Sequence, residues 1–292
     1  VKALREGFTT GSCAAAAALA SCLWQRDGAC PERVEIVVPA GKTFAPEIIA
    51  HGGYVCGVIK DGGDDPDITT GSEVRARVRL MESDGGIRFL AGDGVGTITL
   101  PGMKLPVGEA AINPVPRRMI EQAVRQVFPA RAAEVTVSIP GGEELARRTF
   151  NPHLGIEGGL SILGTSGVVE PMSQQALVDT IGVELRQARA YGADRLLLTP
   201  GNYGLDFLCR SGLELPGVPC VKCSNFLGEA LDMAGGEGFS AVVVVSHAGK
   251  LVKVAGGVMN THSRLADCRM EILVAHAAVQ GADQVLCRRL ME

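Results

Sequence analysis

The stretch EVRARVRL at residues 73–80 alternates apolar and charged side chains along its whole length. Successive side chains of a strand point to opposite faces of a sheet, so this alternation predicts a β-strand with one buried face and one solvated face. Short runs with strand-like composition flank it, each bounded by glycine, proline or aspartate. They are VEIVVP at 34–39, EIIAH at 47–51, YVCGVIK at 54–60 and EVTVSIP at 134–140.

Two helices are predicted to accompany these strands. The segment FTTGSCAAAAALASCLW at 8–24 places Thr10 or Ser12 at an N-cap position, ahead of an alanine-rich run with high helix propensity. A second helix is predicted to start at Pro114–Pro116 and to continue through RRMIEQAVRQVF, because proline suits the first helical turn. The first half of the chain is therefore expected to be an α+β domain.

The second half has a different pattern. Continuous apolar runs, among them GLSILG at 159–164, RLLLTP at 195–200 and AVVVVSH at 241–247, alternate with segments of helical periodicity. Uninterrupted apolar strands between amphipathic helices predict an α/β domain with a mostly parallel sheet, covered on both faces. We place the domain boundary near residue 150, which gives an α+β domain at 1–150 and an α/β domain at 151–292.

Composition limits the class of partner. A formal net charge of −4, a pI near 5.8 and 4% aromatic residues speak against nucleic acid. No apolar run is long enough to span a membrane and no signal peptide is visible, so no membrane partner is expected. The nine cysteines include a single CxxC, at Cys220 and Cys223, which favours neither a disulfide framework nor a zinc site and predicts a reducing, cytoplasmic location. Assembly into a homo-oligomer is left open.

Glycine and small polar residues follow four of the predicted strands. In an open parallel sheet, ligands bind outside the carboxyl ends of the strands, where glycine lets backbone N–H groups reach them. Tight turns also explain such loops, although less readily for four loops than for one. None of the loops matches the dinucleotide or nucleotide-phosphate fingerprint. The loops are Gly164-Thr165-Ser166-Gly167, TPGNYG at 199–204, Ser224-Asn225 and SHAGK at 246–250.

The stretch KDGGDDPD at 60–67 concentrates carboxylates in a single loop. Three interpretations stay open: oxygen ligands for a hard cation, an Asx-rich turn between strands, or carboxylates that act as a base or stabilise charge. The spacing departs from that of an EF-hand. His247 and His262 lie in polar, glycine-rich surroundings and are the histidines favoured for function, whereas His276 lies in an apolar helix.

Six segments spread over both halves carry a resemblance to a known family. They are REGFTTGSCAAAAA at 5–18, VIKDGGDDPDITTG at 58–71, NPHLGIEGGLSILGTSGVVEPMS at 151–173, TPGNYG at 199–204, KCSNFLGEAL at 222–231 and HAGKLVKVAGGVMNTHSRLADCRMEILVAHAA at 247–278. In these segments the chain resembles the cobalt-precorrin-5B C(1)-methyltransferase family (CbiD) of anaerobic cobalamin biosynthesis. The resemblance implies a ribosomal-protein-S5-like first domain, a three-layer α/β second domain, and a C-terminal tail beyond residue 292.

The resemblance also implies a reaction: a methyl group passes from S-adenosylmethionine to carbon 1 of cobalt-precorrin-5B, which gives cobalt-precorrin-6A. The cobalt arrives inside this tetrapyrrole substrate, so no protein metal site is implied. A carboxylate from Asp61, Asp64 or Asp65 would stabilise positive charge on the ring or accept a later proton. The carboxylate-rich macrocycle calls for cationic and polar partners. The residues expected to bind it are Thr9, Thr10, Ser12, Lys60, Asn225, His247, Lys250, His262 and Arg264.

We hypothesise that S-adenosylmethionine lies over the loops 164–167 and 201–204, with Glu170 or Asp206 on its ribose hydroxyls. The residues expected to bind it are Gly164, Thr165, Ser166, Gly167, Glu170, Gly201, Asn202, Tyr203 and Gly204. Further cations near the carboxyl ends of the second sheet are Lys222, Lys253 and Arg269.

Two other functions compete with methyl transfer. A non-catalytic corrinoid carrier would bind the macrocycle without binding S-adenosylmethionine. A phosphoryl-transfer enzyme is suggested by the helix start Thr9-Thr10-Gly11-Ser12 beside an Asp-rich turn, although no Walker-type lysine accompanies it. Glycine-rich loops at several strand ends favour an enzyme over a carrier.

Overall fold

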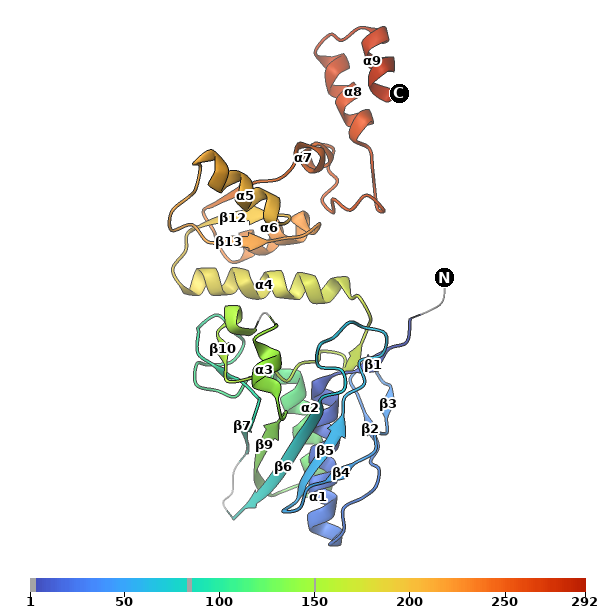
Figure 1. Ribbon diagram of the computed structural model, residues 1–292, viewed down its shortest axis with the longest axis vertical. Helices are drawn as coiled ribbons and strands as arrows, with labels where there is room; N and C mark the ends of the chain where they lie inside the picture. The colour runs from blue at the N-terminus through green and yellow to red at the C-terminus, as the bar shows by residue number, and fades with distance from the viewer. Residues whose placement is uncertain (1–3, 83–85, 150) are drawn as a thin grey trace. The chain divides into compact units, whose positions relative to one another are not determined.

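The structure, a computed structural model, describes residues 4–82, 86–149 and 151–292. The chain divides into two compact units, Val1–Ser173 and Gln174–Glu292 (Figure 1). We call them the first and the second unit. The division after Ser173 lies later in the chain than the boundary expected near residue 150.

Two short strands explain the later boundary, because they tie residues 151–173 to the first unit. β10 (Ile156–Glu157) pairs antiparallel with β8 (Thr97–Ile98). β11 (Val168–Val169) pairs antiparallel with β1 (Gly7–Phe8). The chain therefore completes the first unit before it enters the second.

The first unit is built on a mixed five-stranded sheet with the strand order β4-β5-β6-β9-β7. Neighbouring strands are antiparallel except for β9 and β7, which run parallel. The strands are β4 (Ile49–Ala50), β5 (Val55–Ile59), β6 (Glu73–Met81), β9 (Ala132–Ser138) and β7 (Ile87–Ala91). A separate hairpin pairs β2 (Ile36–Val37) with β3 (Thr43–Phe44).

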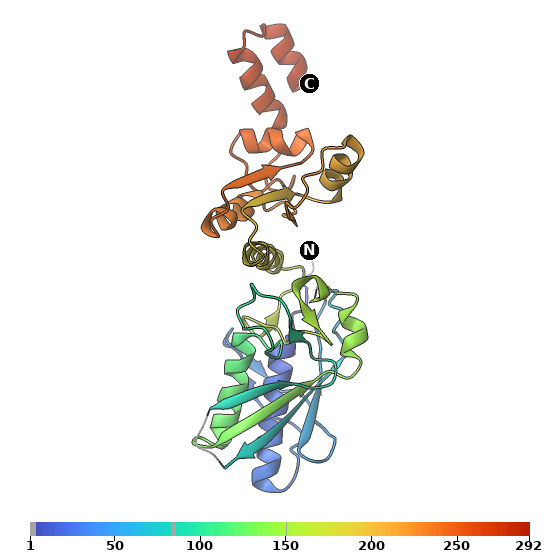
Figure 2. The same cartoon turned by 90° about the vertical axis from the view of Figure 1, so that its left-hand side faces the viewer.

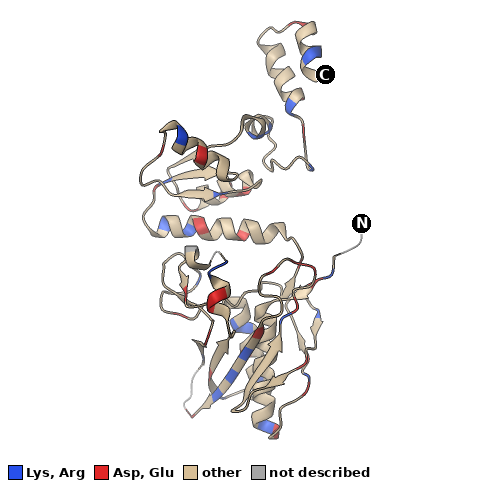
Figure 3. Ribbon diagram, viewed as in Figure 1, with Lys and Arg blue, Asp and Glu red and all other residues tan. Residues whose placement is uncertain are grey.

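The alternation predicted for 73–80 is confirmed in β6. Val74, Ala76 and Val78 are buried in the core of the first unit. The basic residues between them lie along the other face of the strand (Figure 3), where Arg79 pairs with Glu134 of the neighbouring β9. One face of the sheet is thus covered and the other is polar, as expected for a strand of this pattern.

Two helices cover the apolar face of this sheet (Figure 2). α1 (Thr10–Asp27) packs on β5, β6 and α2 (Pro114–Val127), and its residues from Thr10 to Cys22 are all buried. Alanine suits this position because a small side chain lets sheet and helix approach α1 from several sides. Two short helical segments follow β9, namely α3 (Gly142–Ala146) and η1 (Asn151–Leu154).

The N-cap of α1 is Thr9, one residue before Thr10 and three before Ser12, the two positions expected from the sequence. The hydroxyl oxygen of Thr9 accepts a hydrogen bond of 3.2 Å from the backbone N–H of Ser12. Thr10 instead begins the helix, and its hydroxyl contacts a distant loop described below. The predicted proline start of α2 is confirmed, with Pro114 as the first residue of the helix.

The second unit holds a small parallel sheet with the order β13-β12-β14. Its strands are β12 (Arg195–Thr199), β13 (Cys220–Lys222) and β14 (Ala241–Val244). Leu185, Leu196, Leu198 and Ala230 are fully buried in its core. The helices are α4 (Gln174–Ala190), α5 (Asn202–Ser211), α6 (Leu227–Gly236), α7 (Ala248–Ala255), α8 (Arg269–Val279) and α9 (Gln284–Met291). None of the described helices has the length and apolarity needed to cross a membrane.

One expectation for the second half was wrong. The run GLSILG at 159–164 is not a strand of the parallel sheet; it lies in the first unit, where Ile162 forms an isolated bridge with Ile112. The final helix, expected through RLADCRMEILVAHAAVQG at 264–281, is present as the shorter α8, and the sequence did not indicate α7 before it or α9 after it. The parallel sheet therefore has three strand ends that carry loops, not four.

Candidate functional site

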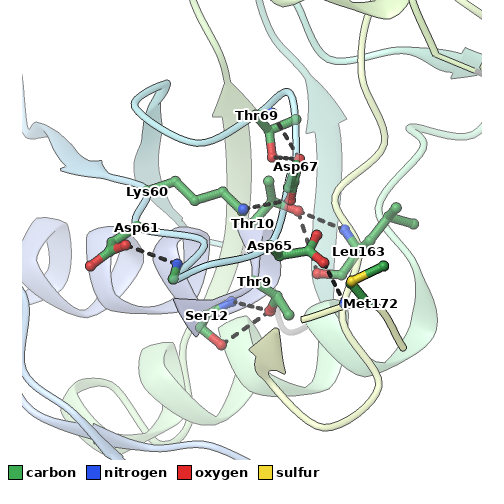
Figure 4. A network of polar contacts seen from close by, with 11 residues as sticks. Thr9, Thr10, Ser12, Lys60, Asp61, Asp65, Asp67, Thr69, Leu163 and Met172 are labelled. Atoms are coloured by element: carbon green, nitrogen blue, oxygen red, sulfur yellow. Dashed lines mark hydrogen bonds and ion pairs between the residues drawn. The ribbon is translucent and has the colours of Figure 1, made fainter. Parts of the chain in front are cut away.

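The start of α1 is occupied by the loop at residues 163–167. The backbone N–H of Gly11 donates to the carbonyl oxygen of Leu163 at 2.9 Å, and the N–H of Leu163 donates to the hydroxyl of Thr10 at 2.9 Å. The hydroxyl of Ser12 donates to the carbonyl oxygen of Gly167 at 2.6 Å. The helix start at 9–12 and the loop at 163–167, each of which resembles a ligand-binding loop in sequence, are thus hydrogen-bonded to each other (Figure 4).

The glycines of that loop are required by this contact. Gly164 has φ +136, and a Cβ there would lie 2.3 Å from the hydroxyl oxygen of Thr9. Gly167 has φ +81, and its Cβ would lie 2.5 Å from the side chain of Val38. Both positions combine a left-handed backbone with a close neighbour, so a larger residue is excluded by the chain's own packing.

The Asp-rich loop lies beside this network and is tied to the N-terminal segment. Arg5 donates to both carboxylate oxygens of Asp61, at 2.5 and 2.9 Å, and its backbone N–H donates to Asp64 at 2.7 Å. The Arg5 side chain and the N–H of Gly63 lower the pKa of Asp61 to about 2. Asp65 accepts a hydrogen bond from the N–H of Met172 at 2.8 Å (Figure 4).

Lys60, expected to bind substrate, is a buried cation inside the loop. Its side chain is 1% exposed, and its ammonium donates to Asp67 at 2.6 Å. The other oxygen of Asp67 accepts from the N–H and the hydroxyl of Thr69, at 2.8 and 2.6 Å. Burial raises the pKa of Asp67, but hydrogen bonds from Lys60 and Thr69 outweigh burial, so the pKa lies below its usual value.

These contacts favour the interpretation of 60–67 as an Asx-rich turn. Asp61 and Asp67 each accept a hydrogen bond from the backbone N–H two residues later, at Gly63 and Thr69. Within the described ranges, no group of three or more His, Cys, Asp or Glu side chains is placed to hold a metal ion. Asp64 and Asp65 nevertheless keep one carboxylate oxygen each that accepts no hydrogen bond from a described group.

The described part of the first unit contains at least two cavities. A cavity of about 590 Å³ runs along β7 and is also lined by Glu109 and Arg117, residues that the sequence did not point to. Arg117 donates to Glu109 and lies over the ring of Phe89, 5.1 Å from its centroid. A second cavity of about 270 Å³ includes Thr165 among mostly apolar neighbours. Of the predicted site residues, only Thr165 lines either cavity.

The carboxyl edge of the parallel sheet in the second unit collects several predicted residues. We use this name for the three loops that follow β12, β13 and β14. Gly201 is the N-cap of α5 and His247 is the N-cap of α7, and neither helix start has a side-chain cap. The rings of Tyr203 and His247 meet edge to face at 5.1 Å, so the loops after β12 and β14 touch.

Gly201 and Gly204, in the loop after β12, have different structural roles. A Cβ on Gly204 would lie 2.8 Å from both Thr199 and the carbonyl oxygen of Val245, so Gly204 lets α5 pack against the strand ends. A Cβ on Gly201 would meet nothing within 4 Å. Its backbone is extended, so any residue tolerates this conformation. Open space therefore adjoins Gly201 and the uncapped start of α5.

Lys250 connects the outer two strand ends. Its ammonium, carried by α7 after β14, donates to the side-chain oxygen of Asn225, after β13, at 2.9 Å. Burial lowers the pKa of Lys250 from its usual value. Ser224, the residue before Asn225, has a left-handed backbone with φ +51, a strained conformation for a non-glycine residue. The buried hydroxyl of Ser246 has no hydrogen-bond partner among the described groups.

The remaining predicted residues are distributed over the surface and the interior. Glu170, Asp206, Lys222, His262 and Arg264 are exposed. Lys253 is buried. Arg269 forms an ion pair with Asp267. The loops 164–167 and 201–204, expected to hold one cofactor together, belong to different units.

Comparison with known proteins places the chain among relatives that share both units. The CbiD model matches residues 1–171 and the model of the CbiD C-terminal domain matches residues 260–292. A protein of Desulfitobacterium hafniense (strain Y51) is 47% identical over 96% of this chain and 73% of its own length. A protein of Thermoanaerobacter sp. (strain X514) is 45% identical over 100% of this chain and 80% of its own length. Both are named cobalt-precorrin-5B C(1)-methyltransferase.

A solved structure is also similar: the crystal structure of the cobalamin biosynthesis protein (cbiD) from Archaeoglobus fulgidus. It is 28% identical, with a TM-score of 0.48, over 90% of this chain and 83% of that chain. The match of residues 1–171 and the identity to the curated relatives establish the family. The chain belongs to the CbiD family.

Proposed function

We propose that this chain is an S-adenosylmethionine-dependent C-methyltransferase that methylates carbon 1 of cobalt-precorrin-5B and gives cobalt-precorrin-6A in cobalamin biosynthesis. The observation that carries the proposal is the 47% identity to a curated cobalt-precorrin-5B C(1)-methyltransferase across both units. S-adenosylmethionine supplies an electrophilic methyl group, and the protein's task is to orient that group and the ring carbon for in-line transfer.

We propose the carboxyl edge of the second unit as the S-adenosylmethionine site. The donor set fits this molecule: the uncapped start of α5 and the cation Lys250 suit an amino-acid carboxylate. Tyr203 is 70% exposed, and its ring offers a stacking surface for adenine. The exposed carboxylate of Asp206, on the first turns of α5, suits ribose hydroxyls. This proposal keeps Gly201–Gly204 and assigns Gly164–Gly167 to packing against the start of α1.

For the catalytic carboxylates we propose Asp64 and Asp65 ahead of Asp61. Both oxygens of Asp61 are held by Arg5. Asp64 and Asp65 each retain an oxygen without a hydrogen bond in the described part of the chain. A carboxylate oxygen free of strong donors is available to stabilise charge on the electron-donating ring.

We further propose that the two units have a ribosomal-protein-S5-like fold and a three-layer α/β fold, respectively. Helices α1 and α2 on one face of a mixed sheet support the first, and a parallel sheet between helices supports the second. A cytoplasmic location is proposed because all nine cysteines are free thiols, a state that a reducing compartment maintains. Assembly into a homo-oligomer stays a prediction.

The test is incubation of the purified chain with S-adenosylmethionine and cobalt-precorrin-5B under anaerobic conditions. We expect stoichiometric S-adenosylhomocysteine and a macrocycle heavier by one methyl group, identified as C1-methylated by NMR. Macrocycle binding without S-adenosylhomocysteine formation would contradict the proposal and favour the corrinoid carrier. Calorimetric titration with S-adenosylhomocysteine alone tests the cofactor site separately from turnover.

A further inference from the structure

Lys253 is a buried cation that no acidic side chain in the described part of the chain pairs with. The residue is 2% exposed, and its ammonium donates to three neutral oxygens: the carbonyls of Thr261 at 3.3 Å and Ala266 at 2.9 Å, and the hydroxyl of Ser263 at 3.3 Å. Among the described residues it forms no ion pair; Asp267, the carboxylate whose pKa it helps to lower, is bound to Arg269. Burying an unpaired charge is costly, so this position calls for an explanation beyond packing.

The three oxygens belong to one segment, residues 261–266, which follows α7 in the chain and is hydrogen-bonded to Asn225, after the end of β13. Val258 begins this path by donating its N–H to the carbonyl of Lys253 at 3.0 Å. Met259 then accepts from the N–H of Gly228, and Asn260 forms a bridge with Phe226. Lys253 therefore acts as the anchor of a segment that has no helix or strand of its own to hold it.

Thr261 links Lys253 to the carboxyl edge through hydrogen bonds to Asn225. It is 3% exposed, its N–H donates to the carbonyl of Asn225 at 2.9 Å, and its hydroxyl donates to the side-chain oxygen of Asn225 at 3.4 Å. The same side-chain oxygen accepts the ammonium of Lys250. A continuous chain of hydrogen bonds thus runs from Lys253 through Thr261 and Asn225 to Lys250.

We propose that Lys253 is a positioning residue: its buried ammonium fixes Thr261 against Asn225, and Asn225 holds the ammonium of Lys250 at the carboxyl edge, where Lys250 binds a substrate carboxylate. The proposal rests on the proposed function for the identity of the substrate. Lys250 has a neutral amide oxygen as its described partner, so its charge stays available to an anion. The carboxylate belongs either to S-adenosylmethionine or to a side chain of the macrocycle.

The kinetic test is a double-mutant cycle with Lys250→Met, Lys253→Met and the double variant. Loss of a charge-assisted hydrogen bond to Lys250 raises the KM of the substrate that carries the carboxylate by roughly tenfold to a hundredfold. We expect Lys253→Met to raise the same KM at least several-fold with little change in kcat, and the double variant to equal Lys250→Met alone. The substrate whose KM rises, S-adenosylmethionine or the macrocycle, identifies the source of the carboxylate. Effects that multiply in the double variant overturn the proposal.

A second readout needs no turnover: the rate at which acetic anhydride modifies Lys250, followed by mass spectrometry. Release from Asn225 makes the Lys250 amine more reactive, so we expect Lys253→Met to speed its modification. Lys253→Arg keeps the positive charge at this position and should show the wild-type rate. Arg195→Met is the matched control, because it removes an exposed cation at the opposite end of β12. Thr261→Val interrupts the same path if Lys253→Met does not fold. An unchanged modification rate in folded Lys253→Met or Thr261→Val overturns the proposal, even if the chain lacks methyltransferase activity.

Discussion

The hydroxyl of Ser12 donates a 2.6 Å hydrogen bond to the backbone carbonyl oxygen of Gly167, 155 residues further along the chain. Both groups are buried, and Thr9 donates its N–H to the same carbonyl. The bond joins the first turn of α1 to the loop that ends the first unit. Without the Ser12 hydroxyl this carbonyl would keep the N–H of Thr9 as a partner, so the contact is worth one buried hydrogen bond.

We expect Ser12→Ala to lower the free energy of unfolding of the first unit by about 1–2 kcal/mol, because it removes a buried hydrogen bond. Trp24, the only tryptophan of the chain, lies in α1 and reports the unfolding of this unit by its fluorescence in a urea titration. Thr165→Ala is the matched control, because Thr165 is an exposed hydroxyl of the same loop. Equal stability of the two variants would show that the Ser12 bond contributes nothing.

Breaking the buried pair of Lys60 and Asp67 should be more costly. Asp67→Asn leaves the ammonium of Lys60 buried without a counter-ion, and we expect a loss of about 3 kcal/mol or more. Lys60→Met should cost less, because Asp67 is partly exposed and keeps its hydrogen bonds from Thr69. Trp24 fluorescence again provides the measurement. A larger loss in Lys60→Met than in Asp67→Asn would contradict this account.

The pair of Lys60 and Asp67 also predicts how the free energy of unfolding depends on pH. The pKa of Asp67 is lower in the folded chain than in the unfolded chain, where it is about 3.9. Its contribution to stability is therefore fully present above that unfolded value and is lost as pH falls through the folded pKa. Between about pH 5 and pH 2, wild type should lose more unfolding free energy than Asp67→Asn. Parallel losses in the two proteins would show that Asp67 does not titrate in this way.

Burial of α1 predicts the reactivity of its cysteines. Removal from water raises the pKa of Cys13 and that of Cys22 to about 12. The thiolate is the reactive form, so iodoacetamide at pH 8 should modify the exposed Cys209 long before either of them. Urea should abolish the difference in rate, because it exposes α1. Peptide mapping by mass spectrometry measures each site, and rapid labelling of Cys13 in the native protein would contradict the buried helix.

Local patterns in the sequence were sufficient to predict much of the fold. The alternation of 73–80 needs only the two-residue period of a strand, and β6 has it. The alanine run and its polar start predict α1 by propensity, with the N-cap displaced by one residue to Thr9. The parallel strands β12 and β14 were predicted by their continuous apolar runs, RLLLTP and AVVVVSH.

The candidate site was harder to predict because its decisive partners are distant in sequence. Gly164 and Gly201 follow similar patterns, yet one packs against Thr9 and the other faces open space. Lysines were expected to be surface cations that meet substrate, whereas Lys60 and Lys253 are buried. The backbone carbonyl oxygens that accept hydrogen bonds from Lys253 are present in every residue type, so no sequence pattern can predict this contact.

Substitutions at Gly164 and Gly201 distinguish a glycine needed for packing from a glycine needed for cofactor binding. Gly201→Val should leave the fold intact, because its backbone is extended and the space around it is open. The added side chain would fill the space beside the start of α5, so we expect calorimetry to show an affinity for S-adenosylhomocysteine that is about tenfold weaker or worse.

Gly164→Ala should instead lower stability and leave binding of S-adenosylhomocysteine unchanged. Its methyl group would collide with Thr9 on a left-handed backbone, which should destabilise the first unit by about 2 kcal/mol. The folded fraction should nevertheless bind S-adenosylhomocysteine with wild-type affinity, and weaker binding in Gly164→Ala alone would move the cofactor site to the first unit.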